Sequence, residues 1–234
     1  GFYDQPALAS TIIVPDSSAS VQLAIDSGAD TILIRDGSYP ERLAVRDPVV
    51  LIGIGVAQRP RIDGLDIYNT NFWSTPPAVS VSDITFLRTV THTLTNLFPR
   101  NLEISFLRCR LEGGFNQPLS TDPDDIWSLA FTECVLLGTN SARAGIVTMV
   151  ADTVHGIASW STIEVSVTDC LFTGSGLRLR GAPRGLVARN RMEGCDVGLA
   201  VVDVDLTIEE NTFRSCATGM SLMGSRADIV RNDL

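Results

Sequence analysis

Residues 79–86 read Val-Ser-Val-Ser-Asp-Ile-Thr-Phe, and residues 165–172 read Val-Ser-Val-Thr-Asp-Cys-Leu-Phe, which aligns with the first stretch without a gap. Both stretches alternate apolar and polar residues, as a short half-buried strand does, and then pass a bend to another apolar residue. A self-similar unit of this kind is typical of a repeat protein, because one copy cannot bury its apolar face without a stacked neighbour.

The sixth position of this unit, which we call the slot, recurs seven times, at Ile84, Cys109, Cys134, Cys170, Asn190, Asn211 and Asn232. By subtraction of these numbers, successive slots lie 25, 25, 36, 20, 21 and 21 residues apart. The residues three before and two after the slot are apolar in every copy. One register repeated in this way predicts an all-β fold, a right-handed parallel β-helix with coils of about 20–25 residues.

The slot residues are predicted to form a ladder inside the β-helix. Asn190, Asn211 and Asn232 would bond through their amides to the coils above and below, and Cys109, Cys134 and Cys170 would act as small buried hydrophobes. A second column follows five residues later, at Ser175, Cys195 and Cys216. A disulfide is conceivable between stacked coils, with free buried thiols as the favoured alternative. The cysteines have no CxxC pair and no neighbouring histidine, so we predict no metal site and no cofactor.

The position before the slot is predicted to face solvent and carries alternating charge. It is occupied by Asp83, Arg108, Glu133, Asp169, Arg189, Glu210 and Arg231. Neighbouring charges have opposite sign except for Glu133 and Asp169, which flank the longest gap between slots. We expect ion pairs between successive coils, each contributing about 0.2–1 kcal/mol and helping to fix the coil register.

The N-terminal third is predicted to be a cap followed by the first coils. Ser17, Ser18 and Ser20 precede an apolar stretch at 21–25, which indicates a short capped helix. Residues 31–34, 42–45 and 49–52 are then expected to be strands, separated by Gly37 and by an Asp-Pro turn at 47–48.

Residues 18–55 (SASVQLAIDSGADTILIRDGSYPERLAVRDPVVLIGIG) resemble the opening of pectin lyase-like parallel β-helix proteins, which include pectin methylesterases and a broad carbohydrate-binding and sugar-hydrolase group. In that family a helix covers the first coil, and a Gly-x-Tyr-x-Glu stretch, here Gly37, Tyr39 and Glu41, leads into the second. The resemblance runs from about residue 11 to the end, and its motifs specify the fold rather than a reaction.

These observations predict an N-terminal arm at 1–10 and one β-helix domain at 11–234. The domain divides into the cap and first coils at 11–64, coils with long insertions at 65–162, and regular coils at 163–234. The last residues, Asn232-Asp233-Leu234, fall within a repeat and show no C-terminal cap. Because an open end exposes strand edges, we expect a protein partner or a continuation of the chain there.

Composition excludes several classes of function. The formal net charge of −9 argues against a nucleic-acid surface, and no apolar run is long enough to span a membrane. All 18 basic residues are arginine, so no mechanism can use a lysine base. The opening GFYDQPALAS is not a signal peptide, but a mature secreted domain remains open. We expect an extracellular or cell-surface location.

Three segments interrupt the regular coils: 66–77, 113–126 and 138–162. Each contains or adjoins one tryptophan, Trp73, Trp127 or Trp160, and Tyr68, Asn69, Asn71 and Phe72 surround the first. Insertions in a solenoid gather on one side and build a binding face, and aromatic rings stack on sugars. We therefore predict glycan contacts for Tyr68, Trp73, Trp127 and Trp160. The alternative is that the tryptophans pack the loops onto the β-helix.

The catalytic candidates are Asp122, Asp124, Asp125 and His155. Asp122, Asp124 and Asp125 could act as paired carboxylates in glycoside hydrolysis, although adjacent aspartates in a polar loop are usually solvated. The Gly-His-Gly element of polygalacturonase-like β-helices is matched only by Val154-His155-Gly156. The Asp-Pro-His motif of uronate epimerases lacks its histidine here, and the methylesterase motifs are not found. His92 and His155 are expected to be isolated surface residues.

A cluster of arginines offers a second kind of binding site. Residues 178–191 contain Arg178, Arg180, Arg184, Arg189 and Arg191, which could hold uronate or sulfate groups through bidentate contacts. Arg189 already has a ladder partner in Asp169 or Glu210. The pectate lyase pattern Arg-x-Pro-x-x-Arg is not met by Arg180-Gly-Ala-Pro-Arg184. Arg178 and Arg180 are therefore predicted as binding rather than catalytic residues.

The sequence thus favours a polysaccharide-interacting β-helix domain of a secreted or surface protein that does not turn its ligand over. Two alternatives stay open: a lyase, hydrolase or epimerase acting on acidic glycans, and a structural rod segment of an adhesin, fibre or larger assembly. The first alternative requires the aspartates, His155 and the arginines to converge in one groove. No intact catalytic motif decides whether the protein is an enzyme.

Overall fold

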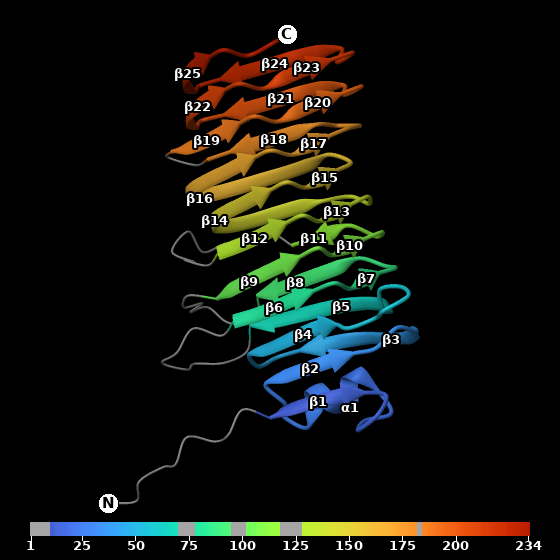
Figure 1. Cartoon of the computed structure of the whole chain (residues 1–234). Coiled ribbons are helices and arrows are strands. Elements are labelled where there is room, and N and C mark those ends of the chain that lie inside the picture. Colours follow the sequence, from blue (N-terminus) through green and yellow to red (C-terminus); the bar gives the residue numbers. More distant parts are fainter. Residues whose placement is uncertain (1–9, 70–77, 95–101, 118–127, 182–183) are drawn as a thin grey trace, which may run out of the picture.

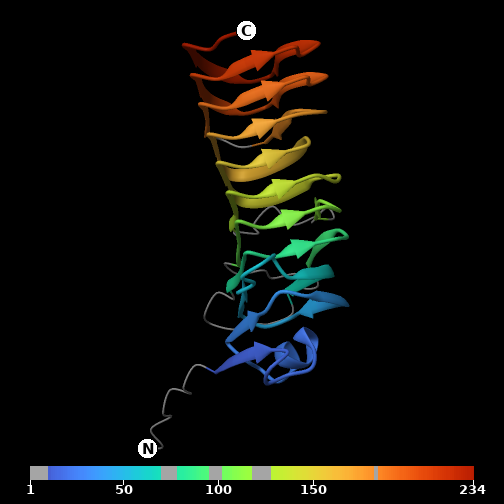
Figure 2. The ribbon, with the colours of Figure 1, turned by 45° about the vertical axis from the view of Figure 1, so that its right-hand side comes forward.

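The protein is a parallel β-helix, as the repeat predicts. The computed structural model describes residues 10–69, 78–94, 102–117, 128–181 and 184–234. Within these ranges the chain forms 25 strands and one short helix. The strands stack in parallel into successive coils, with β1 and the helix at one end and the last coil at the other (Figures 1 and 2).

Each regular coil contributes a strand to each of three faces, which we call sheets I, II and III. Sheet I carries the slot register and leads to the bend at which the slot residue lies. Its strands are β1 (Thr11–Val14), β2 (Thr31–Ile34), β4 (Val49–Gly53), β6 (Ala78–Ser82), β9 (Glu103–Leu107), β12 (Ser128–Thr132), β19 (Gly185–Ala188), β22 (Asp205–Glu209), β25 (Arg226–Val230) and the second halves of β14 (Ser141–Val150) and β16 (Ile157–Thr168).

Sheet II follows the slot and consists of very short strands. They are β7 (Thr85–Phe86), β10 (Arg110–Leu111), β13 (Val135–Leu136), β15 (Thr153–Val154), β17 (Leu171–Phe172), β20 (Arg191–Glu193) and β23 (Thr212–Arg214). Sheet III follows sheet II after a turn. It contains β8 (Val90–Leu94), β11 (Phe115–Asn116), β18 (Leu177–Arg180), β21 (Val197–Val202), β24 (Thr218–Met223), the first halves of β14 and β16, and most of β3 (Ser38–Val45) and β5 (Arg61–Asn69). The first residues of β3 and β5 belong to sheet II, where β5 pairs with β7.

The core runs along the axis as columns of inward-facing apolar side chains. Phe106 and Phe131, three residues before their slots, stack with ring centroids 5.3 Å apart, and Phe115 packs edge-on against both. These residues are fully buried. At the last coil the same inward positions are occupied by exposed side chains, among them Leu222 and Ile229.

The interpretation of residues 138–162 as an insertion is wrong, because this segment forms a complete coil. Strand β14 pairs with β12 before it and with β16 after it, and β15 pairs with both β13 and β17. Asp152 occupies the slot of this coil, 18 residues from Cys134 and 18 from Cys170. The gap of 36 residues is therefore two short coils of 18, and the slot occurs eight times among the residues that the structure describes.

The residue before each slot adopts a left-handed conformation, with φ between 49° and 58° at all eight positions. This conformation turns the chain from sheet I into sheet II and points the side chain outward. Three of the predicted ion pairs form, between Asp83 and Arg108, Asp169 and Arg189, and Glu210 and Arg231. Glu133 and Asp169 are not neighbours, because Ala151 lies between them.

The predicted helix is α1 (Val21–Asp26), with Ser20 as its N-cap. Glu41 of the Gly-x-Tyr-x-Glu stretch caps the same end. Its carboxylate accepts hydrogen bonds from the backbone N–H of Val21 (2.8 Å) and Gln22 (3.1 Å) and from the Ser20 hydroxyl (2.6 Å). The motif thus joins the helix to the first strand of sheet III.

All five cysteines are free thiols, as favoured by the sequence, and four of them are buried. The prediction that His92 is a surface residue is wrong: it lies in β8 and is fully buried. Its burial lowers the pKa of the imidazole to about 4. None of the helices in the described ranges is long and apolar enough to cross a membrane.

Candidate functional site

Sheet III presents a column of mostly polar side chains to solvent. In register from one strand to the next, the outward positions are Asp66, Thr91, Asn116, Ser141, Ala158, Arg178, Ala200 and Ser221. Two pairs of neighbours in the column are joined by polar contacts: Arg42 donates to both Asp66 and Thr91, and Ser141 donates to Asn116 at 2.7 Å. The neighbours of Arg178 in the column, Ala158 and Ala200, have small side chains.

Two hollows adjoin along this column and share Ala158 and Arg178. The first, of about 500 Å³, lies at the turns between sheets II and III, and its polar lining includes Asn140, His155 and Ser175. The second, of about 360 Å³, lies on the face of sheet III, where Arg178 and Arg180 stand beside Ala200 and Ser221. Together they form a groove, which we call the sheet III groove.

His155 is held in the groove by its neighbours in the next coil. Its Nδ1 lies 3.2 Å from the Thr173 hydroxyl, and its ring packs directly on Gly174, where an added Cβ would come within 2.7 Å of the ring. Gly174 also has a φ of +65°, which a glycine adopts without strain. The imidazole is exposed, so it can contact a ligand in the groove.

Asn140 shapes the turn at the base of the groove. Its Oδ1 accepts from the Phe115 N–H at 3.0 Å, and its Nδ2 donates to the carbonyls of Gly138 and Gly156. The side chain is 5% exposed. Because its hydrogen-bonding groups are used within the protein, Asn140 is a structural residue of the groove rather than a ligand contact.

The arginine cluster separates into paired and unpaired members. Arg184 pairs with Glu164 at 2.9 Å, Arg189 with Asp169 at 2.7 Å, and Arg191 with Glu193 at 2.7 Å. Arg178 and Arg180 form no ion pair with a described residue, and both are exposed on β18. The two arginines predicted to bind a ligand are thus those whose charge is not already balanced by a described carboxylate.

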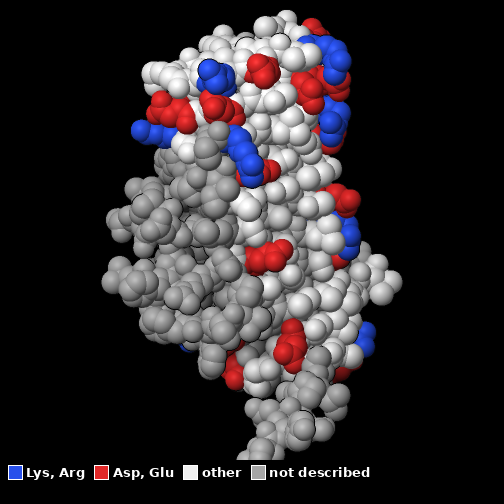
Figure 3. All heavy atoms as spheres, turned by 90° about the vertical axis from the view of Figure 1, so that its left-hand side faces the viewer, with Lys and Arg blue, Asp and Glu red and all other residues white. Residues whose placement is uncertain are grey.

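Charge is unevenly spread over the surface. On the face drawn in Figure 3, acidic and basic side chains alternate along one border and gather over the coils near the C-terminus. Within the described residues, neither hollow of the groove is lined by an aspartate or a glutamate. The described lining of the groove is therefore positive although the chain carries a net charge of −9.

Tyr68 lies on the same sheet but far from the groove. It is half-buried on β5, and the Arg46 guanidinium stands over its ring, 5.5 Å from the centroid. Five strand spacings separate β5 from β18 in sheet III, or about 24 Å at ~4.8 Å per strand. The structure thus does not bring Tyr68 together with Arg178 and Arg180.

Several predicted site residues lie outside the described residues: Trp73, Trp127, Asp122, Asp124 and Asp125, together with Asn71 and Phe72. The segments that contain these residues follow β5 and β11 of sheet III and precede β6 and β12 of sheet I. Trp160 lies in β16 in register with Arg180, and its side chain is outside the description. The predicted convergence of the aspartates with His155 therefore stays a prediction.

The comparisons with known proteins do not assign a function to this site. No protein-family model matches the sequence, and no curated protein matches it. Among solved structures, the A-module of the mannuronan C-5 epimerase AlgE6 of Azotobacter vinelandii is 11% identical, with a TM-score of 0.41 over 89% of this chain and 94% of that one. The AlgE4 A-module of the same organism is 13% identical, with a TM-score of 0.31 over 98% and 96%. Likenesses this weak carry no argument about activity.

The sequence does not predict Ser175 as a groove residue or Asp152 as a slot residue. The predicted column of Ser175, Cys195 and Cys216 is wrong for Ser175, which lies exposed beside Gly156 at the turn. Asp152 could have been found by dividing the gap of 36 residues into two equal coils. Within the described ranges, no group of three or more His, Cys, Asp or Glu residues could hold a metal ion.

Proposed function

We propose that the protein binds an acidic polysaccharide along the sheet III groove and does not turn it over. The observation that carries the proposal is the pair of exposed arginines, Arg178 and Arg180, on one strand of the groove without a described carboxylate partner. A guanidinium group binds carboxylate or sulfate bidentately, which gives both charge and geometry for a uronate or a sulfated sugar.

The shape of the groove suits an extended chain that runs parallel to the β-helix axis. Small side chains at Ala158, Ala200 and Ser221 leave room beside the arginines. The strands of sheet III are spaced by about 4.8 Å, which is comparable with the length of one pyranose unit in an extended chain. Successive sugars could therefore meet successive coils, with an acidic group at Arg178 and hydroxyls at Ser221, Ser141 and Asn116.

Binding without turnover is proposed because the described groove offers one imidazole and no carboxylate. A glycosidase needs two carboxyl groups about 5–9.5 Å apart, one of them as a general acid. His155 alone does not provide this pair. As a polysaccharide-binding domain, the protein would act outside the cell or on its surface, where such polymers are found.

The test is a binding titration with oligosaccharides of one length and different charge. Isothermal calorimetry with oligomannuronate and oligogalacturonate should give saturable binding, whereas neutral mannan and galactan oligomers should bind at least about tenfold more weakly, a difference of ~1.4 kcal/mol. Arg178→Ala and Arg180→Ala should each weaken binding of the acidic oligomers by about tenfold, as expected for loss of one charged hydrogen-bonding group.

Arg214→Ala is the matched control. Arg214 is exposed on β23 of sheet II and also lacks an ion pair with a described residue, so its loss changes the net charge equally but leaves the groove intact. Equal loss of binding in all three variants would point to non-specific attraction and contradict the site. New reducing ends, unsaturated sugars or epimerised sugars after incubation with the wild-type protein would overturn the absence of turnover.

A further inference from the structure

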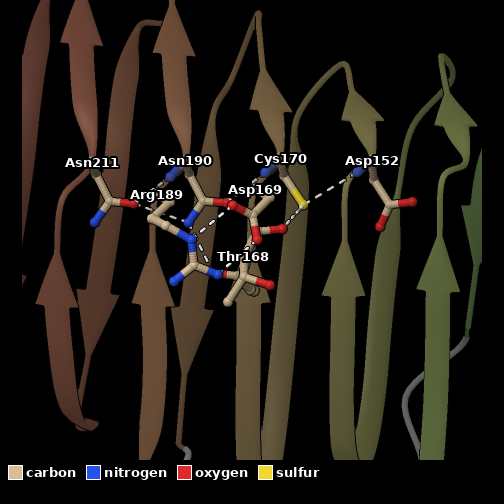
Figure 4. Close-up of polar contacts among 8 residues, drawn as sticks. Asp152, Thr168, Asp169, Cys170, Arg189, Asn190 and Asn211 are labelled. Atoms are coloured by element: carbon tan, nitrogen blue, oxygen red, sulfur yellow. Dashed lines mark hydrogen bonds and ion pairs between the residues drawn. The ribbon is translucent and has the colours of Figure 1, made fainter.

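Asp152 is the one acidic residue in the interior ladder of slot residues. It is 1% exposed, and in the stack it lies between Cys134 and Cys170. Figure 4 shows Asp152 beside Cys170, in line with Asn190 and Asn211. The Cys134 N–H donates to Asp152 Oδ1 at 2.7 Å, as the Cys170 N–H donates to Asn190 Oδ1 at 2.9 Å. Asp152 therefore takes the place of an asparagine, and one of its oxygens acts as the asparagine oxygen does.

The other oxygen of Asp152 stands where asparagine has its NH₂ group. In the asparagine rungs this group donates to the carbonyl three residues before the preceding slot: Asn190 to Val167, Asn211 to Val187 and Asn232 to Ile208, each at 2.7–2.8 Å. The thiol of Cys134 contacts the equivalent Phe106 carbonyl. For Asp152 the equivalent carbonyl is that of Phe131.

Nothing in the described residues donates a hydrogen bond to Asp152 Oδ2, which is buried. An ionised carboxylate would leave this oxygen unsatisfied and facing carbonyl oxygens, and both effects are costly in the interior. A protonated carboxyl group would instead donate from Oδ2, as the asparagine amide does. The geometry thus fits the acid and not its anion.

The groups around Asp152 do not stabilise a negative charge. Cys134 and Cys170 face it from the coils on either side, and Glu133, whose charge acts on Asp152 from outside, is itself negative. Burial raises the pKa of the Asp152 carboxyl to about 7. Backbone hydrogen bonds at Cys134 and Val150 lower the pKa, but burial has the larger effect. Burial, together with the Asp152 charge, raises the pKa of the Cys170 thiol to about 12.

We propose that Asp152 is a proton-dependent rung of the ladder: in the folded protein it keeps its proton, donates from Oδ2 to the Phe131 carbonyl, and loosens its own coil when ionised. This coil carries the sheet III groove. His155 is three residues further on, and its N–H bonds to the Leu136 carbonyl at 2.9 Å, while Thr153 bonds to the Cys134 carbonyl at 2.8 Å. Ionisation of Asp152 therefore acts on the coil that positions His155.

The direction of the pH effect follows from the two states of the carboxyl group. The folded protein holds the proton up to about pH 7, whereas the unfolded chain loses it near the ordinary value of 3.8. The contribution of Asp152 is therefore most favourable below pH 3.8, and it is lost as the pH rises to about 7, with no further change above. One proton linked in this way changes the folding equilibrium constant by up to about tenfold per pH unit.

His92 acts in the opposite direction over nearly the same range. Its imidazole takes up a proton in the folded state only near pH 4, so it destabilises the fold as the pH falls from 6.5 to 4. In the wild-type protein the two effects offset each other. The informative quantity is therefore the difference between the wild type and a variant of Asp152, not the pH profile of either alone.

The variant is Asp152→Asn, which replaces the proton-dependent donor with a permanent one. The measurement is urea unfolding of the full chain from pH 4 to pH 8. The ratio of the folding equilibrium constant of the variant to that of the wild type should rise by up to about tenfold per pH unit until about pH 7. Above pH 7 the ratio should stay constant. Asp169→Asn is the matched control, since Asp169 is exposed and paired with Arg189. It should show no such gain above pH 5.

Infrared spectroscopy gives a readout that does not depend on the stability of the variant. With ¹³C-labelled aspartate, wild-type protein at pH 6 should show the carbonyl band of one protonated carboxyl group, which disappears above about pH 7 and is missing in Asp152→Asn. A difference in stability that does not change with pH overturns the proposal. So does a wild-type spectrum at pH 6 that contains only carboxylate bands, even if Asp152→Asn does not fold.

Discussion

The side-chain oxygen of Asn211 accepts two hydrogen bonds from Asn190, one from its backbone N–H and one from its Nδ2, both at 2.9 Å. The same pair of bonds joins Asn211 to Asn232 in the next coil. Each asparagine also donates to a strand carbonyl of the coil before it. The ladder thus joins successive coils from the inside, and at the buried rungs Asn190 and Asn211 no water competes for these groups.

Asn211→Ala should therefore strongly destabilise the β-helix. The substitution removes the two bonds accepted from Asn190 and the bonds that Nδ2 donates to Val187 and Asn232, and it leaves buried donors on Asn190 unsatisfied. At roughly 1 kcal/mol for each hydrogen bond, and more for an orphaned buried donor, we expect a loss of about 3 kcal/mol or more in the free energy of unfolding. Urea denaturation followed by circular dichroism measures it.

Asn232→Ala serves as the comparison within the same ladder. Asn232 lies in the last described coil and is only partly buried, so water can replace its bonds to Asn211. We expect a loss of about 1 kcal/mol. An equal loss in the two variants would mean that burial does not determine the strength of the ladder.

Glu41→Ala should release helix α1 from the first coils. The Glu41 carboxylate receives two backbone N–H groups from the start of the helix and the Ser20 hydroxyl. Loss of these three bonds to a partly buried charge should cost about 2 kcal/mol. Hydrogen exchange at the amides of Val21 and Gln22 should accelerate, while the amides of the last coils should exchange as before.

Glu41→Gln tests whether the charge or the shape matters. The amide oxygen can still accept from one backbone N–H, but the second position now carries a donor that faces donors. We expect most of the loss seen with alanine. A glutamine variant as stable as the wild type would assign the role of Glu41 to packing.

The repeat made the fold predictable, because the same apolar register returns at each slot. Three features were not predicted from the sequence: the two short coils, Asp152 in the slot and the burial of His92. Two coils of 18 residues read as one long gap, and an aspartate in the slot does not look like an interior residue. His92 between two threonines reads as part of a polar loop, although the alternation of β8 turns it inward.

The candidate site was predictable only in part. Arg178 and Arg180 could be named from the sequence, but five arginines within 178–191 look equivalent until the coils are stacked. The partner of Arg184 is Glu164, which comes from the preceding coil. Two of the three ion pairs, those of Arg184 and Arg189, join different coils, and they depend on a register that the misread gap obscured.

The native thiols should differ sharply in reactivity. Cys109, Cys134, Cys170 and Cys195 are buried, and Cys216 is partly exposed near the C-terminal end. Burial raises the pKa of the Cys195 thiol to about 11, which lowers its reactivity further. An aromatic disulfide reagent should therefore modify one thiol per native chain quickly and all five after denaturation. Cys216→Ser should abolish the fast phase; a remaining fast phase would place another cysteine at the surface.

The position of His155 can be tested without altering His155 itself. In Gly174→Ala the new methyl group would meet the imidazole at 2.7 Å, so the ring must leave its place beside Thr173. Alanine at a φ of +65° also costs about 1 kcal/mol or more of stability through backbone strain. If His155 contributes to ligand binding, the affinity for an oligouronate should fall by about threefold or more, that is by ~0.7 kcal/mol.

Gly194→Ala separates the two effects of this substitution. Gly194 has a φ of +61°, but an added Cβ there has no atom within 4 Å, so the variant carries the same backbone strain without touching a side chain. Its thermal stability should fall by a similar amount while its affinity for the oligouronate stays that of the wild type. Equal affinities in both variants would show that His155 does not contact the ligand. Arg178 and Arg180 would then be the proposed polar contacts of the binding surface. A loss of affinity in Gly174→Ala alone would place the ligand against the coil that Asp152 holds.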